Sequence, residues 1–246
     1  MDHWLLDDHR SLAERDEPET SLPRSLGRNR LLRMLMMLCR ELPGELERRS
    51  FDDGEVWPTD RHAPHEVVFP LAAVATLVQE GMDGRLAPLA LVGNDGLWDH
   101  AAFAHDPKVG RRAWIVHAGG EALVIQRDRL VAASHASPSV FRVLCNWDRV
   151  LLDRVAQSAL CNRHHDVAQQ VATFLLLHQR RYRMSSLAVT QTTLARILGL
   201  RRESVSRSIG KLAAGGAVNT DESRICIAST AKLKASACEC WQADAD

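Results

Sequence analysis

The sequence predicts an α+β multidomain protein, with an N-terminal jelly-roll β domain, one long helix and a C-terminal winged helix-turn-helix. Short apolar runs between turn sequences fill residues 51–125, which is typical of a β-sandwich or jelly roll. Residues 138–162 instead repeat apolar side chains every three or four positions, the pattern of a helix. Residues 190–218 read as two short helices joined at a glycine and followed by a hairpin.

The composition is that of a folded globular protein. The 246 residues carry no formal net charge and are 46% hydrophobic and 25% charged, which suits two modest domains. The six cysteines are scattered, and this favours reduced thiols over a disulfide framework. No run approaches the ~18 apolar residues of a membrane span, and the polar, acidic start does not resemble a secretory signal. We therefore expect a cytoplasmic protein that makes no membrane contact.

The N-terminal segments are predicted to lie outside the β-rich region. Residues 1–27 hold seven acidic and three basic residues with proline and serine interspersed, and we predict a mobile acidic tail there. Residues 30–49 are predicted to form one or two short helices, interrupted at Pro43 and Gly44.

Residues 28–135 are predicted to form a β-roll domain. Its predicted strands lie at 67–69, 74–78, 89–92, 114–116 and 122–125. Turn sequences such as Asn94-Asp95-Gly96 and Gly119-Gly120 separate these strands. Short strands about ten residues apart favour two packed sheets.

Residues 136–165 are predicted to form a dimerisation helix. Six side chains fall on one of its faces: Val140, Leu144, Trp147, Leu151, Val155 and Ala159. A long helix between two domains must bury such a stripe, and a parallel coiled coil with a second copy does so. This interpretation predicts a homodimer. The alternative is that the stripe packs on the chain's own β domain.

Residues 166–246 are predicted to form the winged helix-turn-helix. Thr190 is a suitable N-cap for the first short helix, and Gly199 permits the sharp turn into the second. The second helix, residues 201–214, repeats Val205, Ile209 and Leu212 as an apolar stripe. Two short strands at 217–219 and 224–228 then make a wing, and residues 230–241 are expected to form a closing helix.

The second helix predicts a DNA-binding surface. Residues 167–216 hold eight basic residues and a single acidic one, a net charge of +7, although the whole chain is neutral. A local basic surface, not the overall balance, determines the attraction for phosphates. A helix with one buried stripe and a small, arginine-bearing outer face fits the major groove of DNA.

The segment Leu200-Arg201-Arg202-Glu203-Ser204-Val205-Ser206-Arg207 is similar to SRETVSR, the recognition-helix signature of the Crp/Fnr superfamily of bacterial transcription regulators. The order of β-roll, dimer helix and winged helix-turn-helix also resembles this superfamily over nearly the whole chain. Segments such as CNR at 161–163 and CEC at 238–240 resemble a branch without a well-defined ligand. The resemblance implies a cyclic-nucleotide-binding-like β domain. It also implies that Arg202, Glu203 and Arg207 contact bases and phosphates, since arginine donates to guanine and glutamate accepts from cytosine.

The predicted function is sequence-specific DNA binding by a homodimeric transcription regulator, not an enzyme. The helix 201–214 is expected to enter the major groove of a palindromic double-stranded operator, with RNA polymerase as a candidate further partner. The predicted DNA-binding residues are Thr190, Gln191, Arg196, Arg201, Arg202, Glu203, Ser206, Arg207 and Lys211. Two alternatives come from other classes: a ligand-gated sensor whose β-roll binds a small molecule, and a protein-interaction module that does not bind DNA.

Two residues of the predicted recognition helix depart from the superfamily pattern. Arg201 replaces the usual serine N-cap, which loses a cap of about 1 kcal/mol but adds a phosphate contact. Gly210 stands where a basic residue is common and costs about 1 kcal/mol in helix propensity. We therefore expect a base preference that differs from the commonest site of the superfamily.

The β-roll is predicted to bind no cyclic nucleotide. Residues 96–100 lack the Gly-Glu step that holds the ribose in nucleotide-binding members, and Trp98 would crowd that position. Arg111 and Arg112 lie near the phosphate position of those members. They are predicted to be solvated loop charges, and whether either of them binds an anion stays open.

No cofactor, metal site or catalytic residue is predicted. The first 38 residues contain no cysteine, which argues against an N-terminal iron–sulfur site. Cys238 and Cys240, even with Cys226, supply three thiolates, one short of a four-ligand site, so packed thiols are expected. Two histidine pairs, at 62 and 65 and at 164 and 165, are expected at the surface. The sequence has no nucleophile elbow, P-loop or HExxH motif.

Overall fold

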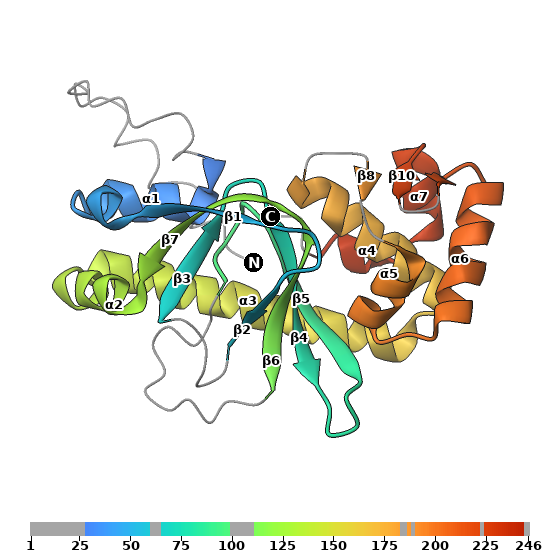
Figure 1. Cartoon of the computed structure of the whole chain (residues 1–246), viewed down its shortest axis with the longest axis horizontal. Coiled ribbons are helices and arrows are strands. Elements are labelled where there is room, and N and C mark those ends of the chain that lie inside the picture. The colour runs from blue at the N-terminus through green and yellow to red at the C-terminus, as the bar shows by residue number, and fades with distance from the viewer. Residues whose placement is uncertain are drawn as a thin grey trace, which may run out of the picture.

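The structure is a computed structural model that describes residues 28–59, 65–98, 111–182, 186–187, 190–221 and 224–243. The predicted acidic tail, residues 1–27, and His62 lie outside the described residues. The chain consists of a β-roll, a long helix that runs along it, and a group of shorter helices with a small sheet (Figure 1). None of the described helices is long and apolar enough to cross a membrane.

The β-roll consists of two antiparallel sheets, one with the strand order β1-β7-β3 and the other with the order β2-β6-β4-β5. The strands are β1 (Glu47–Phe51), β2 (Val56–Pro58), β3 (Glu66–Pro70), β4 (Val74–Glu80), β5 (Leu86–Val92), β6 (Arg112–Ala118) and β7 (Gly120–Gln126). All five predicted strand positions fall within β3 to β7, and the predicted α+β fold class is confirmed. The helix predicted up to residue 49 is wrong at its end, because β1 pairs with β7 and buries only Phe51, which leaves no apolar alternation to detect.

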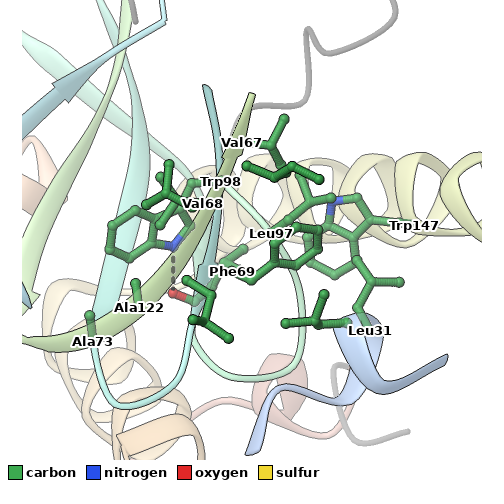
Figure 2. Packing of buried hydrophobic residues seen from close by; sticks show 14 of the residues in the cluster. Leu31, Val67, Val68, Phe69, Ala73, Leu97, Trp98, Ala122 and Trp147 are labelled. Carbon is green, nitrogen blue, oxygen red and sulfur yellow. Dashed lines mark hydrogen bonds between the residues drawn. The ribbon is translucent and has the colours of Figure 1, made fainter. Parts of the chain in front are cut away.

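Aromatic side chains fill the space between the two sheets. Phe51 meets Trp57 and Trp98 edge-on, with ring centroids 5.4 and 5.1 Å apart. Trp98 stacks on Trp114 at 6.1 Å. Its indole Nε1–H donates to the carbonyl of Val92 at 3.3 Å, the dashed line in Figure 2. Trp98 and Trp114 are fully buried, so the chain's own rings occupy the interior of the β-roll.

Three described helices flank the β-roll: α1 (Arg30–Leu38), α2 (Arg127–Ala136) and α3 (Pro138–His164); a 3-10 turn, η3 (Leu42–Glu45), follows α1. The buried side chain of Asn29 fixes α1 in place. Its Oδ1 caps the helix by accepting from the Leu32 amide at 2.9 Å. Its Nδ2 donates to the carbonyls of Pro70 and Gly96 at 2.9 and 2.7 Å. One buried amide therefore ties the helix to two segments of the β-roll.

The apolar stripe of α3 packs on the chain's own β-roll. Val140, Leu144, Trp147 and Leu151 are at most 5% exposed and belong to the β-roll core. Figure 2 shows Trp147 beside residues of α1 and the turn after β5. The prediction that these four residues form a dimer interface is corrected accordingly, because a single chain already buries them.

The last two residues of the predicted dimer stripe differ from the first four. Val155 is partly buried against the same core, and Ala159 is exposed. The alternative interpretation, in which the helix packs on its own β domain, therefore describes most of this face.

The C-terminal part is a winged helix-turn-helix. It contains α4 (Val167–Tyr182), α5 (Gln191–Leu198), α6 (Arg202–Ala214), α7 (Thr230–Ser236) and a 3-10 turn, η4 (Glu239–Trp241). A small sheet of order β8-β10-β9 joins β8 (Ser186–Leu187), β10 (Ile225–Ile227) and β9 (Val218–Thr220). The strands β9 and β10 are the predicted wing. The two-residue β8 was not predicted, since so short a segment carries no detectable period.

The helices of this C-terminal part pack on the outer face of the four-stranded sheet. Trp114 and Val116 of β6 belong to the β-roll core, whereas Ile115 between them belongs to a second core. Leu91 of β5 and Phe174 of α4 lie in that second core as well. Both faces of this sheet are therefore buried, which explains why its strands are almost continuously apolar in sequence.

Candidate nucleic-acid interface

Two caps determine where the first helix of the helix-turn-helix begins and ends. The amide of Thr193 donates to Thr190 Oγ1 at 3.1 Å, which satisfies one otherwise unpaired N–H at the start of α5. Gly199 ends the helix with a φ of +65°, and its amide donates to the carbonyls of Ala195 and Arg196. This left-handed conformation favours glycine. The sharp turn expected at Gly199 is confirmed.

The helix α6 is anchored by one apolar face. Val205, Ile209 and Leu212 are at most 3% exposed and share the second core with α4 and α5. The buried hydroxyl of Ser208 donates to the carbonyl of Ser204 at 2.9 Å, so this polar group is satisfied. Burial of a large aliphatic side chain contributes roughly 1.5–3 kcal/mol. The buried face thereby holds the opposite face of α6 toward solvent.

The solvent face of α6 carries most of the predicted DNA-binding residues. The exposed side chains there are Arg201, Arg202, Glu203, Ser206, Arg207 and Lys211. Thr190 and Arg196 on or beside α5 are exposed too, and Gln191 is half-buried. Within the described part of the chain, none of the basic residues on this face forms an ion pair. Their charges are therefore available to phosphates.

Arg201 and Gly210, the two residues that depart from the superfamily pattern, have different effects on the structure. Arg201 is the N-cap residue of α6, in extended conformation, and its side chain makes no capping hydrogen bond. The first amides of α6 therefore lack the acceptor that Thr190 supplies to α5. Gly210 is exposed, and a Cβ placed there would meet no atom within 4 Å. Packing does not require this glycine, so its effect is confined to helix propensity.

The wing follows α6 directly. Its strands β9 and β10 pair in antiparallel register, with Asn219 opposite Cys226. Near the tip, the amide of Arg224 donates to Asp221 Oδ1 at 2.7 Å, while residues 222 and 223 lie outside the described residues. The wing therefore presents one exposed basic side chain, that of Arg224.

A buried charge cluster joins this domain to the β-roll and to α3. Asp95, in the turn after β5, accepts from Arg154 Nη2 of α3 at 2.6 Å and from Arg181 Nε of α4 at 3.1 Å. Burial alone would raise the pKa of Asp95, but the charges of Arg181 and Arg154 and the Gly93 amide outweigh it and lower the pKa to about 2. The carboxylate is therefore ionised at neutral pH and connects three elements.

Two buried imidazoles lie at the same junction. The rings of His117 on β6 and His178 on α4 are 5.1 Å apart, and both residues are 1% exposed. His117 Nε2 shares a 3.0 Å hydrogen bond with the Thr76 hydroxyl. Burial, followed by the charges of His178 and Arg181, lowers the pKa of His117 well below its usual 6.5. Burial and Arg181 lower the pKa of His178 to about 3, so both rings are neutral near pH 7.

The buried rings of Trp98 and Trp114 occupy part of the interior of the described β-roll. Trp98 lies inside the roll, where the sequence predicts crowding. A cavity of about 90 Å³ lies between β5, α3 and α4, with Leu89 and Phe174 in its lining. Typical ligand pockets measure roughly 300–1,000 Å³. Arg111 is exposed and Arg112 half-buried, and residues 99–110 before them lie outside the described residues.

Comparison with known proteins supports this interpretation of the C-terminal part. The Crp-like helix-turn-helix domain family matches residues 169–236. FixK2 from Bradyrhizobium japonicum is similar in structure, with a TM-score of 0.64 and 19% identity over 78% of this chain and 98% of that chain. The c-di-GMP-responsive global regulator CLP from Xanthomonas campestris has a TM-score of 0.59 and 19% identity over 79% of this chain and 99% of that chain. No curated protein matches the chain in sequence.

The fold, the exposed basic face of α6 and the domain match define the chain as a DNA-binding transcription regulator with a winged helix-turn-helix. The signature at residues 200–207 lies within the matched domain. Residues 169–236 belong to the Crp-like helix-turn-helix domain family, and the chain shares its overall fold with the two solved regulators named above.

Proposed function

We propose that the protein binds a palindromic operator as a homodimer and thereby regulates transcription in the cytoplasm. Each subunit inserts α6 into the major groove, with the two half-sites about one helical turn apart. The observation that carries this proposal is the exposed face of α6, where Arg202 and Arg207 form no ion pair with any described residue. RNA polymerase is the proposed further partner at the promoter.

The residues on this face take two roles. Arg202, Glu203 and Arg207 read base edges, because a guanidinium donates two parallel hydrogen bonds to guanine and a carboxylate accepts from the cytosine amino group. The remaining residues hold the DNA backbone, which fixes register without reading sequence. They are Thr190, Gln191, Arg196, Arg201, Ser206 and Lys211, with Arg224 at the flank.

The proposed dimer forms through the outer face of α3, opposite the face that covers the β-roll. Phe141 and Leu152 are 50% and 66% exposed on this face. Cys145 and Asp148, also exposed, lie between them at intervals of four, three and four residues. That spacing forms one continuous stripe of the kind that two parallel helices share in a coiled coil. It replaces the stripe that the β-roll already covers.

The proposed domains follow one another along the chain: a β-roll at 28–135, a dimer helix at 136–165 and a DNA-binding domain at 166–246. A change in the pairing of α3 would change the spacing of the two DNA-binding domains, which is a two-state switch. The buried position of Trp98 favours a regulator that needs no cyclic nucleotide. No enzymatic activity and no small-molecule cofactor are proposed.

The test begins with selection of the operator from random duplexes by the wild-type full-length protein. The selected duplex is then titrated, by fluorescence anisotropy, with wild type, Arg207→Ala and Arg33→Ala. We expect Arg207→Ala to weaken binding at least tenfold, since a base-reading arginine contributes about 1–3 kcal/mol. Arg33→Ala removes the same charge from the exposed face of α1 and should change the affinity less than twofold. An Arg207→Ala affinity within a factor of two of wild type contradicts the assignment.

Two further measurements separate the alternatives. A protein-interaction module would not select a palindrome, and its binding to duplex DNA would lack a steep dependence on salt. A ligand-gated sensor would gain thermal stability from its effector, because a ligand that binds only the folded state stabilises it by mass action. Melting with a panel of cyclic nucleotides and haem tests that case.

A further inference from the structure

Four potential metal ligands from two distant parts of the chain meet at the hinge between α3 and α4. Cys161 and His165 lie at the C-terminal end of α3, Cys238 lies directly before η4, and Cys240 lies within η4. Their ligand atoms all lie within 4.8 Å of one another. Cys161 Sγ is 3.7 Å from Cys238 Sγ, and Cys240 Sγ is 3.4 Å from His165 Nδ1.

We propose that these three cysteines and one histidine bind a Zn²⁺ ion that ties the hinge to the C-terminal end of the DNA-binding domain. Zinc in proteins prefers four ligands in a tetrahedron, with Zn–S distances of ~2.3 Å and Zn–N distances of ~2.0 Å. Ligand atoms in such a tetrahedron lie roughly 3.5–3.8 Å apart. The two separations above are close to these values. Three cysteines and one histidine complete the tetrahedron, so the site is structural, with no open position for a substrate.

The surroundings of the four ligands fit a bound cation. The second ring nitrogen of His165, Nε2, lies 3.4 Å from Glu239 Oε1, an arrangement that directs Nδ1 toward the metal. The hydroxyl of Thr173 lies 3.0 Å from Cys238 Sγ and can donate to a thiolate there. Metal-ligating histidines in proteins almost always have such a carboxylate or carbonyl partner.

Burial favours the same conclusion. Cys161, Cys238 and Cys240 form a small buried cluster of their own, between 2% and 9% exposed. A divalent ion bound there would take the place of the thiol protons and pair with the thiolates, away from competing water.

Two other interpretations of the cluster fit the distances less well. A disulfide requires sulfurs about 2.05 Å apart, whereas Cys161 and Cys238 are at 3.7 Å. An iron–sulfur cluster places several irons and sulfides between its cysteines. Four ligand atoms within 4.8 Å of one another leave space for a single ion. Three thiolates and one imidazole in a tetrahedron suit zinc among the common divalent ions.

The sequence spacing explains both the site and why local patterns do not reveal it. Cys161 and His165 are four residues apart, one turn of helix, so they face the same side at the end of α3. His165 is the C-cap residue in extended conformation. Cys238 and Cys240 approach from 77 positions further on. Cys226, which the sequence analysis counted beside Cys238 and Cys240, lies on β10 outside the cluster.

The proposed ion has a structural consequence for DNA binding. It joins the end of α3 to the segment that closes the DNA-binding domain, across the hinge at His165 and Asp166. The orientation of that domain relative to α3 would therefore depend on the metal. This effect adds to the proposed function and is not needed for it.

The experiment uses the full-length protein, purified from zinc-sufficient cells without chelator, and needs no DNA. We expect about one zinc per chain by elemental analysis. Replacement by Co²⁺ should give the intense visible d–d bands and near-ultraviolet thiolate charge-transfer band of a tetrahedral sulfur-rich site. Cys161→Ser and Cys238→Ser should each lose most of the bound metal. The matched control Cys226→Ser removes a half-buried cysteine outside the cluster and should retain it.

Several outcomes would overturn the proposal. The first is a wild-type protein that stays metal-free after reconstitution with Zn²⁺, and the second is bound iron in place of zinc. The third is a cobalt spectrum without thiolate bands. The fourth is a Cys226→Ser variant that loses as much metal as Cys161→Ser and Cys238→Ser. A thiol titration of the denatured, unreduced wild type that finds four free thiols instead of six would point to a disulfide and overturn it as well. The cobalt spectrum of the wild type stays decisive even if a serine variant fails to fold. Loss of operator binding in Arg207→Ala is measured separately, so the two proposals fail independently.

Discussion

Asp95 of the β-roll and Arg181 of α4 form a partly buried ion pair across the boundary between the two domains, with Arg181 Nε 3.1 Å from Asp95 Oδ2 and the Asp95 side chain 27% exposed. Arg154 of α3 donates to the same oxygen at 2.6 Å. The Arg181 and Arg154 side chains are 3% and 10% exposed. A single carboxylate therefore connects the β-roll, the proposed dimer helix and the DNA-binding domain. We expect it to specify their relative orientation, since removal of this carboxylate would take an ion pair from both guanidinium groups.

Substitution of Asp95 tests this connection. We expect Asp95→Ala to reduce the free energy of unfolding by about 3 kcal/mol, because both guanidinium groups lose the carboxylate that they share. Asp153→Ala is the matched control. It removes the carboxylate of the exposed pair with Arg149 and should cost less than about 1 kcal/mol. Urea unfolding followed by circular dichroism measures both values. Equal losses in the two variants would show that the buried cluster contributes no more than a surface pair.

The two buried histidines predict loss of stability in mild acid. The folded-state pKa of His117 lies well below 6.5 and that of His178 is about 3, so the unfolded chain binds more protons below pH 6.5. The stability they permit is present above pH 6.5 and is lost progressively as the pH falls toward 3. Each histidine adds a slope of up to about 1.4 kcal/mol per pH unit. Asp95, with a pKa of about 2, adds its own loss only below about pH 4.

Chemical denaturation at pH 7.5, 6.5, 5.5 and 4.5 measures that slope. The variant His178→Leu should be less stable at pH 7.5 but should show a shallower decline toward acid. His135→Leu is the control, because His135 is exposed near the end of α2. An unchanged slope in His178→Leu would rule out the buried ring as the source of the pH dependence.

The sequence predicted those features whose pattern is local. Thr190, Gly199 and the stripe Val205, Ile209 and Leu212 lie within a short segment, and each has a physical meaning of its own, as a cap, a turn or a buried face. The recognition helix followed from them to within a residue, at Arg202–Ala214. The stripe on α3 was also detected, but a period shows only that a face is buried. It does not say whether a sheet or a second helix covers that face.

Features made by distant residues were not predictable in this way. Asp95 and Arg181 are 86 positions apart, and Cys161 and Cys238 are 77 apart. Asp95 belongs to an Asn-Asp-Gly turn, for which an aspartate needs no further explanation. Only the docking of the helices on the outer face of the four-stranded sheet brings these partners together, and no local period encodes that docking.

Two glycines of the helix-turn-helix should respond oppositely to alanine. Gly199 has a φ of +65°, and a Cβ there would overlap the backbone carbonyl oxygen of Leu86 in β5. We expect Gly199→Ala to destabilise the fold by at least about 1 kcal/mol, through backbone strain and through that contact. Gly210→Ala lies in an exposed helix with free space around it and should stabilise by about 1 kcal/mol. Thermal melting of the two variants and of wild type shows whether each substitution raises or lowers the stability of the fold.

The proposed dimer face predicts different effects for neighbouring residues of α3. Leu152→Glu should convert dimer to monomer and leave the subunit folded, because this side chain is 66% exposed in the single chain. Leu151→Ala should instead lower the free energy of unfolding by about 2–5 kcal/mol, since Leu151 is buried against the β-roll. Sedimentation velocity and urea unfolding measure the two effects. A monomeric wild type, or a Leu152→Glu variant that stays dimeric, contradicts the proposed interface.

Because α6 has no side-chain N-cap, substitution of Arg201 by serine should raise the stability of the fold and lower the affinity for DNA. Arg201→Ser supplies a hydroxyl that can accept from an amide in the first turn, so we expect a gain of about 1 kcal/mol in the free energy of unfolding. The same change removes a phosphate contact, so operator binding should weaken. The slope of log K against the logarithm of the salt concentration should become shallower by about one. Arg201→Ala is the control that loses the contact without gaining the cap. If serine stabilises no more than alanine, the uncapped amides are satisfied in another way. An unchanged salt dependence in both variants would show that Arg201 does not touch a phosphate.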